Sequence, residues 1–254
     1  MSPDLLADVE DASLNASAPP QQRWVDGWWV RYCPGKAKRA RSVNAVAPGR
    51  LPIAEKLARA EAIYREAGLP PVARITPYSQ PPGFDDHLAA RGWQRFDETC
   101  VMVLAAIGSA IQSLPSGTFV REVPAETFAE VVGRWRGSAS SLVAAQIQRL
   151  RTSPVPYRGF LLEADGEPMA CGQFAREGIL AGLYDIHTAA AHRGQGLAGA
   201  LCSSLLATAA AEGARLGYLQ VDASNAPALA VYRRLGFAEG YRYHYRAKDP
   251  VAAG

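Results

Sequence analysis

A run of glycines beside an arginine is the strongest chemical feature of the sequence. It reads Arg193-Gly194-Gln195-Gly196-Leu197-Ala198 and lies between an expected strand and a long expected helix. Glycines let the backbone approach a ligand closely, and the free amides at the start of a helix attract anions. The forked guanidinium of Arg193 suits a phosphate. The segment therefore predicts an anion site, and a diphosphate is the ligand that fits it.

Two classes of ligand fit such a site. With Gly199 included, the glycines follow the fingerprint of dinucleotide-binding folds, and Asp222 ends the next expected strand where a ribose-binding acid would lie. That interpretation predicts an NAD(P)-dependent oxidoreductase. However, residues 189–193 separate the preceding strand from the first glycine, whereas the fingerprint requires a tight turn. The strands that follow are also too few to complete a doubly wound sheet.

The anion segment and a second segment downstream together resemble a known family. Arg193, Gly196 and Ala198 match the Arg/Gln-x-x-Gly-x-Gly/Ala motif with which the GNAT superfamily of N-acyltransferases binds acyl-CoA. About thirty residues later, the stretch from Asn225 to Phe237 is similar to the second hallmark of that superfamily. Two motifs in this order are more specific than either alone. The resemblance covers residues 117–246.

The resemblance implies an α/β (α+β) fold, in which helices flank a mixed, splayed sheet and CoA lies in the splay. The local patterns agree, because strands and helices are mixed and alternate towards the C-terminus. In the second half we expect strands at 118–123, 159–164, 168–176, 179–188, 218–221 and 237–246, and helices at 125–136, 141–151, 197–212 and 227–235.

The resemblance also assigns binding roles. Arg193, Gly194 and the backbone amides of the next four residues, Gln195, Gly196, Leu197 and Ala198, would bind the diphosphate of acetyl-CoA. Ile186, His187 and Thr188, at the end of a strand, would run beside the pantetheine arm. The Ile186 amide would donate to the thioester carbonyl. Asn225 would contact the CoA arm or cap the following helix.

Acid–base roles follow in the same way. Tyr232 matches the general acid of the family, and a phenol pKa near 10 suits protonation of a departing thiolate. Asp185, eight residues before Arg193, is the candidate general base or else a structural carboxylate. His187 falls on the same face of a regular strand and could serve instead. Glu163 and Asp222 are weaker candidates, and a chain of waters is a further alternative.

These roles predict an N-acetyltransferase that moves an acetyl group from acetyl-CoA to a primary amine by direct attack, with no metal. The expected acceptor is a small-molecule or peptide amine, and no nucleic-acid or membrane partner is indicated. The chain is expected to be a monomer or homodimer. Alternatives are a non-catalytic acyl-CoA-binding regulator and a transferase that uses a longer acyl-CoA or a carrier-protein thioester.

The two halves of the sequence resemble each other at a spacing of 144 residues. This shift places Gly236 on Gly92, the helix at 197–212 on one at 53–67, and hairpin 172–188 on hairpin 28–44 without a gap. A repeat this long predicts a duplicated domain. The first copy lacks the chemistry: Gly196, Tyr232, Asp185 and Asn225 fall on Pro52, Leu88, Arg41 and Pro81.

We therefore expect a mobile tail at 1–22, a degenerate GNAT-like domain at 23–107, a linker at 108–116 and a catalytic domain at 117–254. In the degenerate domain, 24–32 and 39–46 are expected strands.

The composition, 48% hydrophobic and 20% charged, is typical of a globular protein. The net charge of +3 is too weakly basic to suggest a nucleic-acid partner. Acidic residues near the N-terminus argue against a signal peptide, so we expect a cytoplasmic protein with reduced cysteines.

Overall fold

The chain forms two compact units in a computed structural model that describes residues 1–35, 37–109 and 113–253. Unit 1 comprises Met1–Ala16 and Cys100–Gly240, and unit 2 comprises Ser17–Thr99 and Tyr241–Gly254. The chain passes between the units after Ala16, Thr99 and Gly240. The last two points lie inside strands, β5 (Gln94–Leu104) and β11 (Ala238–Ala247), so they do not coincide with the domain boundaries expected from the sequence. Within the linker expected at 108–116, residues 110–112 lie outside the described part of the chain.

Unit 1 holds every candidate site residue, on a mixed sheet in the strand order β5-β10-β9-β8-β7-β6. Its strands are β6 (Phe119–Val123), β7 (Tyr157–Ala164), β8 (Glu167–Glu177), β9 (Leu180–Thr188), β10 (Leu216–Asp222) and the second half of β5. Its helices are α1 (Pro3–Ala16), α4 (Ala125–Trp135), α5 (Ser140–Thr152), α6 (Leu197–Ala211) and α7 (Ala226–Arg234), with short 3-10 turns η2 (Ile107–Ser109) and η3 (Ala190–His192). The predicted α/β class with a mixed sheet flanked by helices is confirmed.

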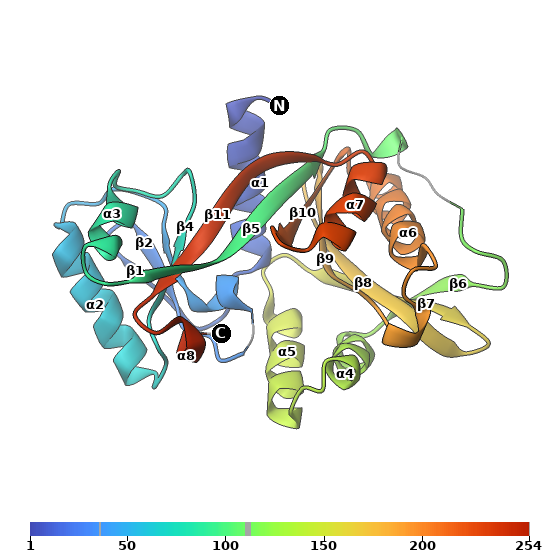
Figure 1. Ribbon diagram of the computed structural model, residues 1–254, viewed down its shortest axis with the longest axis horizontal. Helices are drawn as coiled ribbons and strands as arrows, with labels where there is room; N and C mark the ends of the chain where they lie inside the picture. Colours follow the sequence, from blue (N-terminus) through green and yellow to red (C-terminus); the bar gives the residue numbers. More distant parts are fainter. Residues whose placement is uncertain (36, 110–112, 254) are drawn as a thin grey trace. The chain divides into compact units, whose positions relative to one another are not determined.

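Helices cover both faces of this sheet (Figure 1). On one face, Leu201 and Leu205 of α6 pack with Leu183 of β9 in the main core, all at most 2% exposed. On the other face, Phe128 of α4 packs against Cys171 of β8 in a second core. Burial of apolar surface on both sides explains why the central parts of β7 and β8 and the first half of β9 are rich in apolar residues.

The sheet is splayed between β9 and β10. The two strands pair in parallel from Leu180–Leu216 to Leu183–Leu219, and no further pairs join them in the described chain. Beyond this point β9 continues to Thr188 and β10 to Asp222. The strands therefore separate towards their C-terminal ends, where α6 begins, as the family resemblance implied.

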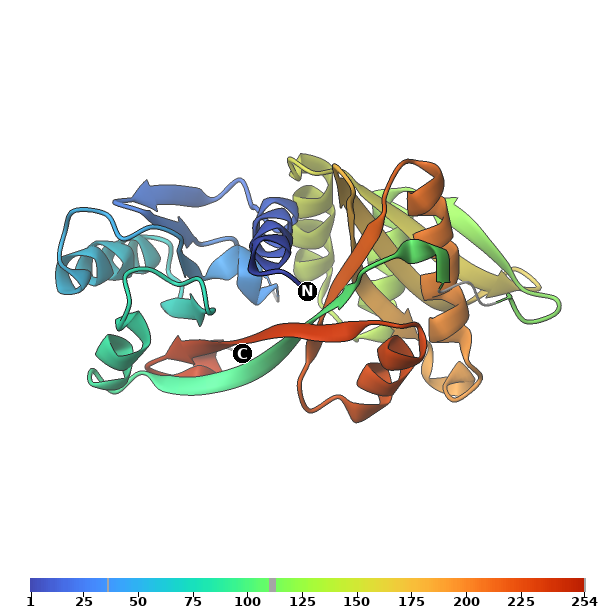
Figure 2. The ribbon, with the colours of Figure 1, turned by 90° about the horizontal axis from the view of Figure 1, so that it is seen from above.

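Unit 2 has a smaller sheet in the order β1-β2-β3-β4-β11. It contains β1 (Gln22–Val25), β2 (Trp28–Arg31), the 3-10 turn η1 (Lys38–Arg41), β3 (Val43–Ala45), α2 (Ile53–Glu66), β4 (Val72–Ile75), α3 (Phe84–Ala89) and α8 (Pro250–Ala253). Trp28, Tyr64 and Trp93, each at most 1% exposed, centre its core, which lies between α2 and the strands (Figure 2).

The predicted repeat is visible in where the elements begin. The spacing of 144 residues separates the starts of α2 and α6, of β4 and β10, and of β5 and β11. The prediction that the hairpins align without a gap is wrong. Trp28 pairs with Ala45, whereas the register of Cys171 with His187, shifted by 144, would pair Gly27 with Val43. The hairpins are thus offset, and we retain duplication as a proposal.

Two long strands join distant parts of the sequence. β4 pairs with β11, from Val72–Ala247 to Ile75–His244, and β5 lies next to β10. Most of β11 therefore belongs to unit 2, and the second half of β5 belongs to unit 1.

The expected mobile tail at 1–22 is not what the structure shows. Pro3–Ala16 is helical, and its residues Val9, Ala12 and Ala16 are at most 4% exposed. Low aromatic content misled the interpretation, because alanines and a valine at helical spacing are enough to bury one face. The four cysteines, Cys33, Cys100, Cys171 and Cys202, are free and buried in the described chain. In the described chain no helix has the length and apolar character needed to cross a membrane.

Candidate active site

The glycine-rich segment forms an open loop at the N-terminus of α6. Gly194 and Gly196 have φ of +78° and +77°, a region that favours glycine, and a Cβ at either position would meet nothing within 4 Å. Gly196 is the N-cap residue of α6, and no side chain accepts a hydrogen bond there from the first amides of the helix. In the described structure, the amides of Gln195, Gly196, Leu197 and Ala198 have no backbone acceptor. Because these amides lie at a helix start with little around them, the loop is suited to an anion.

A β-bulge interrupts β9 immediately before this loop. β8 and β9 pair Gln173 with Tyr184 and then Cys171 with His187, so two residues of β9, Asp185 and Ile186, lie opposite Gly172. Asp185 has φ of +49°. In the described chain, neither Asp185 nor Ile186 pairs with a residue of β8 or β10. The bulge thus leaves one peptide of β9 outside both ladders, in the region where the strands diverge.

The bulge also changes which side chains share a face. Leu183 and Ile186 pack into the core under α6. Asp185 bonds to residues of α5 and β8 on the opposite face, and His187 stacks on Trp135 of α4 with ring centroids 5.6 Å apart. Asp185 and His187 share a face as predicted, although through an irregular strand. Trp135 packs against the second core and also borders this face.

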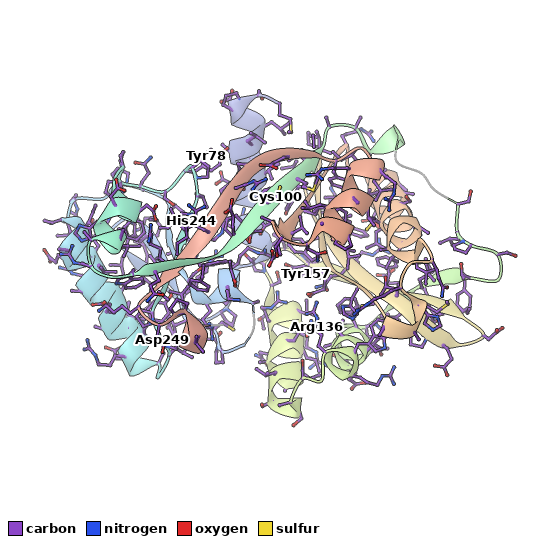
Figure 3. All side chains as sticks on the ribbon, viewed as in Figure 1. Tyr78, Cys100, Arg136, Tyr157, His244 and Asp249 are labelled. Carbon is purple, nitrogen blue, oxygen red and sulfur yellow. The ribbon has the colours of Figure 1, made fainter. Side chains whose placement is uncertain are left out.

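Both carboxylate oxygens of Asp185 are engaged. Arg136 donates to Oδ1 from Nη2 at 3.2 Å, and Gln173 donates to Oδ2 from Nε2 at 2.9 Å. Gln146 of α5 donates to the same Oδ2 at 3.5 Å. Arg136, labelled in Figure 3, directly follows α4. The sequence analysis missed these three partners, although Gln173, a polar residue within the apolar run 170–175, was a signal that could have been used.

His187 is half-buried among cations. Burial lowers the pKa of His187, and the positive charges of Arg136 and Arg193 lower it further, while Asp185 acts in the opposite direction. The imidazole is therefore neutral at pH 7 and able to accept a proton.

Tyr232 lies on α7, on the α6 side of the sheet. The side chain is 8% exposed and packs edge-on against Phe237 with ring centroids 6.1 Å apart. Burial raises the pKa of Tyr232, and the nearby Cys202 thiol raises it further, so the phenol keeps its proton. Within the described residues its hydroxyl has no hydrogen-bond partner. Tyr232 and the pair Asp185–His187 thus lie on opposite faces of the splayed region.

The remaining candidates have structural partners. Asn225 Oδ1 accepts from the Ala228 amide at 3.2 Å and caps α7, which matches the helix-cap alternative. Asp222 Oδ1 accepts from the amide and hydroxyl of Ser224 in the turn before α7. Glu163 is 4% exposed and forms a bidentate ion pair with Arg121. Both oxygens of Glu163 are therefore held by that cation.

Unit 2 carries a closed counterpart of the loop. The shift of 144 places Arg193 to Gly196 on residues 49–52, and α2 begins directly after Pro52. Here the Asp26 carboxylate accepts from the amides of Arg50 and Leu51, both at 2.7 Å. A Cβ on Gly49 would lie 2.0 Å from the Asp26 carbonyl oxygen. The chain's own carboxylate thus takes the place of an external anion.

Replacing Asp26 by asparagine is expected to lower the melting temperature at pH 7. The amides of Leu51 and Arg50 lower the pKa of Asp26, so the charged carboxylate stabilises the folded state. This contribution is complete above the unfolded pKa of about 3.9 and disappears as the pH falls through the lower folded pKa. Thermal melts of both proteins from pH 7 to 2.5 should therefore converge on acidification. A difference that stays constant with pH would contradict this explanation.

Comparison with known proteins finds a family that the second half of the chain resembles. The model of the acetyltransferase (GNAT) family matches residues 122–237, which include the loop, the bulge, Tyr232 and the helix α7. Over this segment the chain is similar to the GNAT acetyltransferases.

Individual relatives extend the similarity beyond that segment. The chain is 27% identical over 231 residues to the uncharacterized N-acetyltransferase YobR of Bacillus subtilis, covering 89% of this chain and 92% of YobR. A GCN5-related N-acetyltransferase from Kribbella flavida superposes with a TM-score of 0.65 at 18% identity, over 96% and 95% of the two chains. A tandem GNAT protein from the clavulanic acid biosynthesis pathway superposes with a TM-score of 0.62 at 18% identity, over 78% and 70%. At these identities the two structures establish the fold alone.

Proposed function

We propose that the protein is an N-acetyltransferase that moves an acetyl group from acetyl-CoA to a primary amine by direct attack. One observation carries the proposal: the loop of open amides at the start of α6 lies where β9 and β10 separate. An anionic diphosphate fits that loop, and we expect the arm of the donor to run along the part of β9 that is not paired with β10, towards the bulge. The family match supports the same donor.

The residues around the bulge supply the remaining steps. The Ile186 amide donates to the carbonyl oxygen of the thioester as negative charge develops on it. The amine approaches from the face of His187, which accepts the proton that the nitrogen loses. Tyr232, on the other face, donates its proton to the sulfur as the carbon–sulfur bond breaks. One proton is thus taken up and one released, and the products are an amide and a free thiol.

The test is a screen of amines with acetyl-CoA. We expect release of free thiol that depends on the amine, with a stoichiometric gain of one acetyl group on the acceptor by mass spectrometry. Small amines, amino acids and peptides with a free N-terminus form the panel, and reactions without amine are the control. Absence of release with every amine, or thermal stabilisation by NAD(P) and not by CoA, would overturn the proposal.

A further inference from the structure

Asp185 adopts a backbone conformation that costs energy. Its φ of +49° lies in the left-handed region, which residues with a Cβ rarely adopt, although aspartate and asparagine tolerate it better than most. Such strain persists only where the surroundings hold it in place. The contacts of Asp185 therefore indicate what this conformation serves.

Donors from three separate elements converge on the carboxylate. Arg136 follows α4, Gln146 belongs to α5 and Gln173 belongs to β8. Gln173 is 1% exposed, so the donor end of its bond to Asp185 is buried, whereas the carboxylate itself is partly exposed. Both oxygens of the carboxylate are thus directed at donors of the protein itself, one of them a guanidinium, and not at an incoming amine.

The backbone of the bulge is held from both faces. The Cys171 thiol donates to the Asp185 carbonyl oxygen, with an Sγ to oxygen distance of 3.8 Å. On the other face, the Ile186 side chain occupies the space over Gly172, where a Cβ would lie 2.5 Å from the Ile186 Cδ1. The peptide that joins Asp185 to Ile186 is thus fixed in direction by side chains at both ends.

We propose that Asp185 is a positioning residue, whose carboxylate ties the bulge of β9 to α4, α5 and β8 and so aims the Ile186 amide at the reacting carbonyl. This inference rests on the proposed function, and it assigns the proton-accepting role to His187 alone. Of the two roles that the sequence left open for Asp185, the proposal takes the structural carboxylate and not the general base.

The experiment compares Asp185→Asn with Asp185→Ala. Asparagine tolerates the left-handed conformation and keeps an oxygen for Arg136, so kcat should fall by less than about tenfold. Alanine keeps neither advantage, and misplacing the amide should lower kcat by about 100-fold. The acidic limb of the pH profile should persist in Asp185→Asn and move to lower pH, because the Asp185 charge raises the pKa of His187. Loss of activity in Asp185→Asn equal to that in Asp185→Ala, with no acidic limb, would overturn the proposal.

Two further measurements keep the test decisive. If Asp185→Ala does not fold, Gln173→Leu removes one donor from the carboxylate and should lower kcat by about tenfold, with the pH profile unchanged. An unchanged kcat in Gln173→Leu would count against the proposal. Hydrogen exchange of the amides in 183–188 needs no substrate. Faster exchange in Asp185→Ala than in Asp185→Asn supports the tie even if no amine is acetylated, and equal exchange contradicts it.

Discussion

Replacing Gly196 by aspartate is expected to weaken CoA binding by at least about 100-fold, or about 2.7 kcal/mol. Aspartate tolerates the left-handed φ of this position, and a Cβ there meets no atom within 4 Å. The new carboxylate would lie at the N-terminus of α6, where such a group accepts from free amides. The Asp26 carboxylate already accepts hydrogen bonds from the amides of Arg50 and Leu51 in this way. The aspartate carboxylate would therefore compete with the diphosphate for the amide donors of the loop, and its negative charge would repel the diphosphate.

Gly196→Asn is the matched control, because it has the same shape without the charge. Calorimetric titration with CoA should give a much smaller loss of affinity for asparagine than for aspartate. Thermal melts without ligand should show that both variants are folded, since either side chain can cap the helix. Equal CoA affinity in Gly196→Asp and the unmodified protein would mean that the diphosphate binds elsewhere.

Tyr232→Phe is expected to lower kcat by about 100-fold, in the range that a lost general acid usually gives. Phenylalanine keeps the ring that packs against Phe237, so the core and the affinity for CoA should be nearly unchanged. The removed group is a hydroxyl whose proton is retained because burial raises the pKa of Tyr232. Steady-state kinetics with the best amine of the screen, together with a CoA titration, measure both quantities.

A second acyl donor separates the role of the proton from a packing effect. A thioester of a more acidic thiol needs no proton as its sulfur leaves, so Tyr232→Phe should be much less impaired with it than with acetyl-CoA. Equal impairment with both donors would assign the loss to altered packing. No impairment at all, with normal CoA binding, would favour the non-catalytic regulator that the sequence left open.

The sequence predicted the helix start and turns well where local chemistry decides them. Helix α6 begins at the expected Leu197, because glycine residues end one element and apolar residues at helical spacing start the next. The Asp165–Gly166 turn joins β7 to β8 with both residues at positive φ, and an Asp-Gly pair between two strands is a local signal for such a hairpin turn. The same signal was overlooked in unit 2, where Asp26 and Gly27 turn within the expected strand 24–32 and divide it into β1 and β2.

Features that depend on distant parts of the chain could not be predicted in this way. The bulge at Asp185 is stabilised by Arg136, Gln146 and Gln173, and no local pattern places these side chains together. The burial of α1 depends on a partner surface that its own composition does not reveal. The choice of β11 instead of β5 as the neighbour of β4 is likewise a matter of long-range pairing, which has no signature in either strand.

The pairing of β4 with β11 has a consequence for how the protein is made. Residues 17–99 leave the ribosome long before β11 does, yet β4 lacks its neighbour until β11 has been synthesised. An unpaired edge at β4 would be open to wrong pairing during this interval, and the great separation in sequence slows the correct closure. Most of unit 2 is thus synthesised early, but unit 2 is the last to be completed. A nascent chain halted at Gly240 would leave β4 without its partner strand and prone to aggregation.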